Sequence, residues 1–438
     1  MRILSITAGA ADMYCGSCLR DNALAAELIA RGHDVLLLPL YTPTRTDERN
    51  VSDPHVFYGG ISVFLQELSP LFRRTPRFLD RLWDAPSVIR AATSRAVSVD
   101  PAQLGDLTLS VLRGEDGHQH KELRKLIDWL KTQPRPDIIV LPNSLLIGLA
   151  APLRAALGRP VCCTLQGEDQ FLEGLPRMQR AAALDIIRAK VPDVDRFLPV
   201  SEYYVDFMAD YLAIPTERLS VLPLGINLDG YPERRQTPAG GATLTVGYFA
   251  RVAPGKGLHV LADAFRALRE RLGVRGARLE VAGYLAPEHR GYLAEVEAKL
   301  SSWGLEGAFA YRGVIDRARK IEFLSGLDVF SVPSTYPDPK GIFVLEAMAC
   351  GVPVVQPRHG AFPEILERTG GGITFEPHDA DRLADELAGL HREPDRAEQL
   401  RRQGAYGVRK HYSAARMADR AIEFFGEVVA SAGLAAVS

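Results

Sequence analysis

The chain has 438 residues, of which 47% are hydrophobic and 24% charged, and its formal net charge is −2. The length predicts two or three domains, and the composition is that of a soluble globular protein. The balanced charge gives no electrostatic case for a nucleic-acid partner, and no apolar run reaches the ~18 residues of a membrane span. Five cysteines, a small and odd number, fit a reducing compartment, so we expect a cytoplasmic protein.

The first half of the chain alternates short apolar runs with segments of helical periodicity. The runs are apolar throughout, which is typical of strands buried on both faces of a parallel sheet. The predicted strands are Ile3–Thr7, Val35–Leu40, Ile138–Leu141, Val161–Leu165 and Phe197–Val200. Helices are predicted between them, for example over Leu19–Ala30, Glu122–Leu130 and Glu202–Leu212.

This alternation is lost from Asn50 to Gln119, where proline, arginine and aromatic residues concentrate. We interpret the segment as an insertion in the first domain. Its basic stretch at residues 69–83 could touch anionic lipid or could be an ordinary solvated helix flanked by core aromatics. We favour the second interpretation.

The alternation restarts after a polar stretch at residues 232–243, rich in proline and glycine, which we interpret as a linker. The second set of predicted strands is Leu244–Phe249, Leu279–Gly283, Phe309–Gly313, Val329–Pro333 and Val352–Gln356. Two successive β-α-β series predict an α/β protein with two Rossmann-like, doubly wound domains, residues 1–232 and 243–412, facing a central cleft. We expect a C-terminal helix within residues 413–438 to cross back to the first domain.

The most informative stretch is Tyr336–Pro353, in which Asp338 and Glu346 stand eight positions apart. A Pro-Lys-Gly turn between them precedes an apolar helix that Gly351 ends. The N-terminus of that helix, next to Gly341, offers unpaired N–H groups and a positive dipole end to a phosphate. Carboxylates on either side would hold the hydroxyls of a sugar and a ribose. The stretch therefore predicts a nucleotide-sugar site.

Two cations follow the first predicted strand of the second domain. Arg251 and Lys256 leave the carboxyl end of Leu244–Phe249, where ligands bind in open α/β sheets. Such a pair can neutralise a diphosphate, although by itself it is equally well explained as solvated surface. The acid motif in the same domain favours the binding role. We expect both side chains to be exposed in the empty site.

These segments resemble the nucleotide-binding half of a retaining glycosyltransferase with the GT-B fold, in glycosyltransferase family 4. The matching text is G-Y-F-A-R-V-A-P-G-K-G, V-A-G-Y, Y-R-G-V-I, V-P-S-T-Y-P-D-P-K-G-I-F-V-L-E-A-M-A-C-G-V-P-V-V and G-A-F-P-E-I. The first half is similar more loosely, through R-G-H-D-V, L-P-V-S-E and V-L-P-L-G-I-N. The resemblance implies a hexosyltransferase that moves a sugar from a nucleoside diphosphate to the hydroxyl of a carbohydrate or another acceptor.

The resemblance also implies roles for single residues. Arg251 and Lys256 would bind the donor diphosphate and stabilise its charge as it leaves, Glu346 would hold the ribose, and Asp338 the sugar hydroxyls. The other implied donor contacts are Gly16 and Ser17 in the first βα turn, Gly313 and Val314 beside the base, and the backbone of Gly341, Ile342 and Phe343. No cofactor, metal or protein nucleophile is implied, because the two cations supply positive charge and the diphosphate accepts the acceptor's proton.

The chain departs from the family pattern at three positions. Asp338 replaces the usual glutamate, and Lys340 replaces an aromatic or apolar residue, so Asp338 could read other hydroxyls or pair with Lys340. Gln166 replaces a histidine on the acceptor side, with Asp169 close behind. Glutamine hydrogen-bonds a hydroxyl but cannot take a proton near neutral pH. These departures leave open a nucleotide-sugar-binding protein without turnover. Other GT-B enzymes are rival interpretations, but the Asp338–Glu346 segment argues against an epimerase and the absence of an obvious pyridoxal-phosphate lysine motif argues against a phosphorylase.

Cys15 and Cys18 form a C-x2-C pair before a predicted helix, a spacing found in redox and zinc sites. No second Cys/His pair at ligand spacing is apparent in the sequence. We therefore interpret the pair as part of a small-residue turn and predict core packing for Cys162, Cys163 and Cys350.

Overall fold

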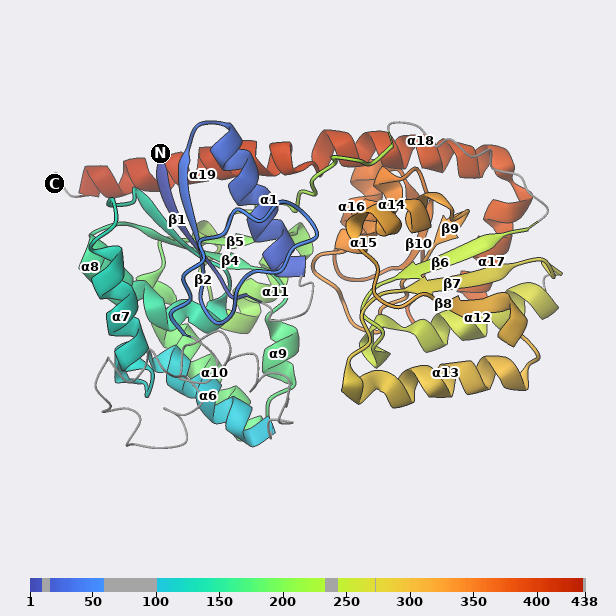
Figure 1. The fold of residues 1–438 in the computed structure, drawn as a ribbon, viewed down its shortest axis with the longest axis horizontal. Coiled ribbons are helices and arrows are strands. Elements are labelled where there is room, and N and C mark those ends of the chain that lie inside the picture. The colour runs from blue at the N-terminus through green and yellow to red at the C-terminus, as the bar shows by residue number, and fades with distance from the viewer. Residues whose placement is uncertain (10–15, 59–100, 233–242, 272, 436–438) are drawn as a thin grey trace. The chain divides into compact units, whose positions relative to one another are not determined.

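The computed structural model describes residues 1–9, 16–58, 101–232, 243–271 and 273–435 (Figure 1). The chain divides into two compact units, Met1–Pro223 with Ala418–Ser438 and Leu224–Met417. The first segment of unit 1 therefore ends nine residues before the predicted boundary at residue 232. Residues 224–232 belong with the second unit because Ile226 exchanges backbone hydrogen bonds with Tyr412 and Ala414. The predicted linker lies largely outside the described residues.

The first unit contains a five-stranded parallel sheet in the order β2-β1-β3-β4-β5. Its strands are β1 (Arg2–Thr7), β2 (Asp34–Pro39), β3 (Ile138–Leu141), β4 (Val161–Leu165) and β5 (Arg196–Pro199). Every residue of β3 and β4 is buried, which explains their uninterrupted apolar letters. All five predicted strands of this half are confirmed to within a residue at each end.

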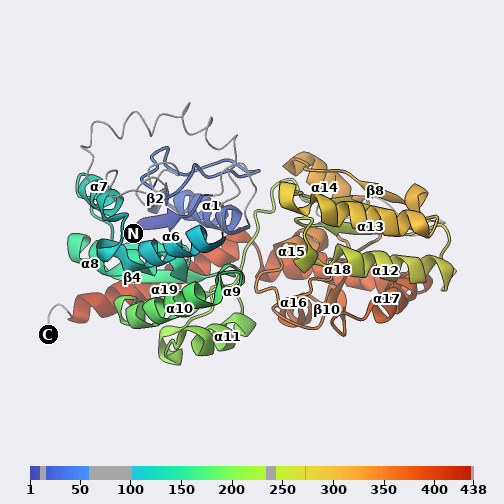
Figure 2. The ribbon, with the colours of Figure 1, turned by 90° about the horizontal axis from the view of Figure 1, so that it is seen from below.

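The helices of the first unit follow the predicted alternation. They are α1 (Gly16–Ala30), α6 (Pro101–Arg113), α7 (His120–Leu130), α8 (Ala150–Leu157), α9 (Asp169–Glu173), α10 (Arg177–Lys190), α11 (Glu202–Leu212) and most of α19 (Ala414–Ala435). Helix α6 lies inside the predicted insertion and packs against α10 (Figure 2). The basic stretch at residues 69–83 lies outside the described residues.

The second unit contains a six-stranded parallel sheet in the order β11-β10-β9-β6-β7-β8. Its strands are β6 (Thr245–Phe249), β7 (Arg278–Ala282), β8 (Phe309–Tyr311), β9 (Val329–Phe330), β10 (Val354–Pro357) and β11 (Gly372–Phe375). Five of them were predicted. Strand β11 was not predicted, because this half-buried edge strand has few apolar residues and follows two glycines.

The helices of the second unit connect these strands in βαβ fashion. They are α12 (Leu258–Glu270), α13 (Arg290–Ser302), α14 (Arg317–Ser325), α15 (Ile342–Ala349), α16 (Phe362–Thr369), α17 (Ala380–Arg392) and α18 (Pro394–His411). Helix α12 packs against α13 and α17, while α18 packs against α15 and α16 (Figures 1 and 2). Both units are Rossmann-like α/β domains, which confirms the predicted fold class. Within the described residues, no helix has the length and hydropathy that crossing a lipid bilayer requires.

Candidate functional site

The candidate site of the second unit lies where β6 and β9 end. These strands are parallel neighbours, so the segments that follow them meet at one edge of the sheet. The N–H of Thr335 donates to the carbonyl of Gly255 at 2.9 Å. Gly257 has a φ of +70°, and a Cβ there would lie 1.8 Å from the carbonyl oxygen of Pro333. Only glycine permits this approach, which brings Lys256 beside the acid motif.

Lys256 and Asp338 form a buried ion pair. Their exposed fractions are 8% and 3%, and the Lys256 ammonium contacts Asp338 Oδ2. The other carboxylate oxygen, Oδ1, accepts the backbone N–H groups of Lys340 at 2.9 Å and Gly341 at 3.3 Å. The ammonium also lies 4.8 Å from the ring centroid of Tyr336 and 5.1 Å from that of Phe343.

The expected exposure of the two cations is therefore only half right. Arg251 is exposed, but Lys256 is buried because Asp338 draws its ammonium inward. The ion pair that Asp338 forms at this turn is with Lys256, while the backbone of Lys340 supplies a hydrogen bond.

The charges of this pair hold each other ionised. Burial alone would raise the pKa of Asp338, but the charge and hydrogen bond of Lys256, together with the N–H of Lys340, outweigh it and lower that pKa to about 2. Burial also opposes the charged form of Lys256. The carboxylate of Asp338 outweighs that effect, so the pKa of Lys256 is raised. Burial and the charge of Asp338 raise the pKa of Tyr336, which stays neutral.

Glu346, in the middle of α15, forms a second buried ion pair. Lys320, from α14, places its ammonium 2.6 Å from Glu346 Oε1, and the Tyr231 hydroxyl donates to the same oxygen at 3.3 Å. The exposed fractions of Glu346, Lys320 and Tyr231 are 6%, 4% and 7%. The sequence analysis missed both partners. One signal for Lys320 was its spacing, because it lies one helical turn before the buried Leu324 and so on the same face of α14.

The backbone between these two pairs contains the N-terminus of α15. Helix α15 follows Gly341, whose φ is +63°, and begins without a side-chain cap. The first N–H groups of a helix have no partner within it, so those of Ile342 and Phe343 remain to be satisfied from outside the helix.

Gly313 and Val314 follow β8, and the carbonyl of Gly313 accepts the N–H of Gly283 at 2.9 Å. Val314 is 53% exposed.

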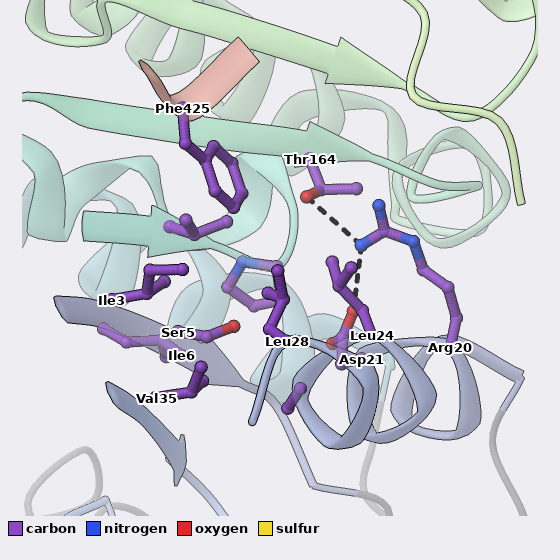
Figure 3. Close-up of a pocket in the computed structure, with 13 residues that line it drawn as sticks. Ile3, Ser5, Ile6, Arg20, Asp21, Leu24, Leu28, Val35, Thr164 and Phe425 are labelled. Carbon is purple, nitrogen blue, oxygen red and sulfur yellow. Dashed lines mark hydrogen bonds and ion pairs between the residues drawn. The ribbon is translucent and has the colours of Figure 1, made fainter. Parts of the chain in front are cut away.

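The first unit places polar residues at the carboxyl edge of its own sheet. Gly16 and Ser17 begin α1, and Arg20 of that helix, which the sequence analysis did not single out, is buried. Its Nη1 lies 3.1 Å from Asp21 Oδ1 and 3.5 Å from Thr164 Oγ1 (Figure 3). Burial lowers the pKa of Arg20, and the charge of Asp21 offsets part of that effect.

A small cavity lies beside this network. It has a volume of about 10 Å³ and is lined by Arg20 and Asp21 together with apolar residues that include Ile3, Leu28 and Phe425 of α19 (Figure 3). Such a volume holds about one water molecule. The cavity is thus too small for a sugar and belongs to the core.

Gln166 and Asp169 follow β4 and are both buried, at 2% and 5% exposed. The Gln166 amide donates to the carbonyl of Pro142 at 2.8 Å, and Asp169 Oδ1 accepts the Tyr204 hydroxyl at 2.6 Å. Between them Glu168, which the sequence analysis did not single out, accepts the N–H of Gln166 at 2.7 Å. Burial raises the pKa of Glu168, although hydrogen bonds from Ser144 and the backbone partly offset it.

The cysteines play no visible part in either edge. Cys18, Cys162, Cys163 and Cys350 are buried and form no disulfide. Burial raises the pKa of Cys162, Cys163 and Cys350, which disfavours the reactive thiolate. Cys15 lies outside the described residues, so the C-x2-C interpretation stays a prediction.

Comparison with known proteins finds a family match for each half of the chain. Residues 21–225 match the family described as "Glycosyl transferase 4-like domain", and residues 232–406 match "Glycosyl transferases group 1". WcaL of Salmonella typhimurium, named for glycosyl transfer in colanic acid biosynthesis, is 30% identical over 203 residues, 45% of this chain and 48% of WcaL. The chain thus spans about half the length of this curated relative.

Two further similarities cover more of the chain. The D-inositol 3-phosphate glycosyltransferase of Salinispora arenicola is 28% identical over 363 residues, 76% of this chain and 75% of that protein. The crystal structure of Anabaena Alr3699/HepE in complex with UDP and glucose has a TM-score of 0.67 and 17% identity, covering 97% of this chain and 99% of that one. At this identity the likeness to HepE concerns the fold.

Proposed function

The chain is a GT-B-fold member of the glycosyltransferase family 4-like group, and we propose that it is a retaining glycosyltransferase. It would move a hexose from a nucleoside diphosphate to the hydroxyl of a carbohydrate or another acceptor. The observation that carries the proposal is the pair of buried lysine–carboxylate contacts, Lys256–Asp338 and Lys320–Glu346, at the two ends of an uncapped segment of backbone.

The donor diphosphate would bind beside α15. Arg251 is exposed and can make two parallel hydrogen bonds to phosphate oxygens. Lys256 and the N-terminal N–H groups of α15 add positive charge and dipole at the same edge of the sheet. Charge on the diphosphate grows as the sugar leaves, so these groups would stabilise the transition state more than the bound donor.

Asp338 would have two tasks. Its carboxylate holds Lys256 in place, and it accepts three hydrogen bonds in all. A carboxylate has about four acceptor positions, so one remains for a hydroxyl of the transferred sugar. Glu346 would bind the ribose, and Gly313 with Val314 would lie beside the base. The sugar acceptor would bind in the first unit, near Gln166 and Asp169.

The departing diphosphate would take the acceptor's proton, so no protein base is needed. Gln166 is consistent with that scheme because its buried amide orients a group by hydrogen bonding and does not titrate. The same residue favours the second candidate function, a protein that binds nucleotide-sugars without turnover. The nucleotide in the HepE structure supports a nucleoside-diphosphate donor here.

Binding and turnover can be tested separately. Thermal unfolding with UDP, GDP and ADP identifies the base, because a ligand at ~100 times its dissociation constant adds about 2.7 kcal/mol of stability. Incubation with the matching nucleotide-sugars then follows hydrolysis or transfer, and NMR reads the anomeric configuration of the product. Retention of configuration supports the proposal. Binding without any donor cleavage would leave the second candidate function, and an inverted product would contradict the retaining mechanism.

The cations of this site would replace a metal ion in stabilising the diphosphate. We therefore expect the transfer rate in excess EDTA to equal the rate in untreated enzyme. A rate that collapses in EDTA and returns with magnesium or manganese would overturn this expectation.

A further inference from the structure

We propose that Lys320 is a positioning residue that fixes Glu346 so that one carboxylate oxygen, Oε2, faces the ribose hydroxyls of a nucleoside diphosphate. Lys320 itself would touch neither the ribose nor the phosphates. The inference rests on the proposed function, because it assumes that a nucleoside diphosphate binds beside α15.

The two oxygens of Glu346 have different surroundings. Oε1 receives both side-chain donors, the Lys320 ammonium at 2.6 Å and the Tyr231 hydroxyl at 3.3 Å. Among the described residues, no hydrogen bond reaches Oε2, and 8% of the Glu346 side-chain surface is exposed. A ribose hydroxyl can donate to that oxygen without displacing either partner of Oε1.

The position of Glu346 in the chain explains why a lysine is needed. Asp338 lies in a turn, where the backbone N–H groups of Lys340 and Gly341 fix one of its oxygens. Glu346 lies within α15, where backbone N–H groups are used by the helix. Only side chains can orient a carboxylate in that place. Without them, the carboxylate could rotate about the last bond of Glu346, and its plane would no longer be fixed for a hydrogen bond from the ribose.

Helix α14 supports both orienting contacts. Lys320 acts on Glu346 directly. Arg317, three residues earlier on the same helical face, lies 5.3 Å from the ring centroid of Tyr231 and donates to the carbonyls of Asn227 and Asp229 at 2.9 Å each. Arg317 thereby fixes the segment that carries Tyr231. The ribose contact is thus built from α14, α15 and residues 224–232 together.

The test compares ligands with and without ribose hydroxyls. Calorimetry gives the dissociation constants of three probes: the tightest-binding of UDP, GDP and ADP, its 2′,3′-dideoxy analogue, and inorganic pyrophosphate. We expect Lys320→Met to weaken the nucleoside diphosphate about 10-fold. The same variant should bind pyrophosphate and the dideoxy analogue as the natural protein does.

Two variants serve as controls for charge and folding. Lys299→Met removes an exposed lysine that pairs with Asp263 in the same unit, and it should change none of the three constants. Lys320→Arg keeps the charge and should restore the preference for the natural ribose. If Lys320→Met fails to fold, the double variant Lys320→Met/Glu346→Gln removes both charges at once. It should then bind the nucleoside diphosphate and its dideoxy analogue equally.

Each outcome decides one point. Equal loss of pyrophosphate binding in Lys320→Met would mean that Lys320 contacts phosphate and would overturn the inference. An unchanged preference for the natural ribose in either Lys320→Met or the double variant would also overturn it. If the natural protein binds none of the three nucleotides, the proposed function itself fails, which is a different result.

Discussion

The carboxyl edges of the two parallel sheets hold their carboxylates in different ways. In the second unit Asp338 and Glu346 each face a buried lysine. In the first unit Asp169 is held by the Tyr204 hydroxyl, and Glu168 by hydroxyl and backbone N–H donors. The first edge has one buried ion pair, Arg20–Asp21, among its described residues.

The pKa values record this difference. Paired with Lys256, Asp338 has a pKa of about 2, whereas burial among neutral groups raises the pKa of Glu168. The two parallel sheets therefore carry different kinds of polar group at their carboxyl edges. One is rich in cations and suits a polyanion such as a diphosphate, and the other is rich in neutral donors and acceptors and suits hydroxyls.

The largest effect should come from the cations of the second edge. Arg251→Ala should lower transfer ~10²-fold, because it removes a charge-assisted contact that strengthens in the transition state. Its melting temperature should not change, since Arg251 is exposed. Lys256→Met should lose as much activity and also about 3–5 kcal/mol of stability, because it leaves Asp338 buried without its partner.

Steady-state rates and urea unfolding of both variants check this pair of expectations. Arg266→Ala, which removes an exposed arginine of α12, is the control and should match the natural protein. Near-normal transfer in both Arg251→Ala and Lys256→Met would contradict the assignment of this edge to the donor.

Asp338→Asn keeps the size of the side chain and removes its charge. Transfer should fall by an amount equivalent to roughly 1.5–3 kcal/mol if a sugar hydroxyl is bound. Asp338→Glu should change the ranking of nucleotide-sugar donors. Rates on several donors check both. An unchanged ranking and unchanged rates in both variants would leave Asp338 as a structural partner of Lys256 only.

Asp338 should also shape the dependence of stability on pH. Its folded pKa of about 2 lies below the ordinary value of 3.8 for an aspartate. Its contribution to stability is therefore fully present above pH ~4 and is lost as pH falls toward 2. The stability difference between the natural protein and Asp338→Asn should shrink over that interval in urea unfolding. A constant difference from pH 6 to pH 2 would contradict the direction of the pKa shift.

The first edge can be tested through Tyr204. Tyr204→Phe removes the hydroxyl that donates to Asp169 and accepts from the N–H of Gly167. We expect a higher KM for the acceptor, by a factor equivalent to roughly 1 kcal/mol of binding free energy for each lost hydrogen bond. The Kd for the nucleoside diphosphate should be unchanged. Tyr211→Phe, on the same helix, is the control. Weakened nucleotide binding in Tyr204→Phe alone would break the division of tasks between the edges.

The smallest effect should come from Glu168, with the opposite sign to that of Asp338. Its folded pKa is raised, so its contribution is fully present below the unfolded value near 4.5 and is lost as pH rises through the folded value. The free energy of unfolding of the natural protein should therefore fall as pH rises above ~4.5 because of Glu168, and Glu168→Gln should make this decline less steep. Urea unfolding at a series of pH values measures this slope. A steeper decline in the variant would mean that Glu168 is held ionised like Asp338.

Local sequence patterns were enough to predict most of the strands and half of the candidate site. The strands were readable because burial on both faces of a parallel sheet forces uninterrupted apolar runs. Asp338 and Glu346 were readable because a turn and a short helix fix their spacing locally. Strand β11 was not, because an edge strand needs fewer apolar residues and its pairing with β10 supplies its order.

The partners of these two carboxylates could not be predicted from the sequence, because they come from distant parts of the chain. Lys256 is 82 positions from Asp338 in the chain, Lys320 is 26 from Glu346, and Tyr231 is 115 from Glu346. No local pattern links such residues. A buried charge must find its partner among whatever side chains packing brings near it, and the choice depends on strand order and helix contacts. For that reason the sequence predicted an exposed Lys256 and gave no sign of the Lys320–Glu346 pair.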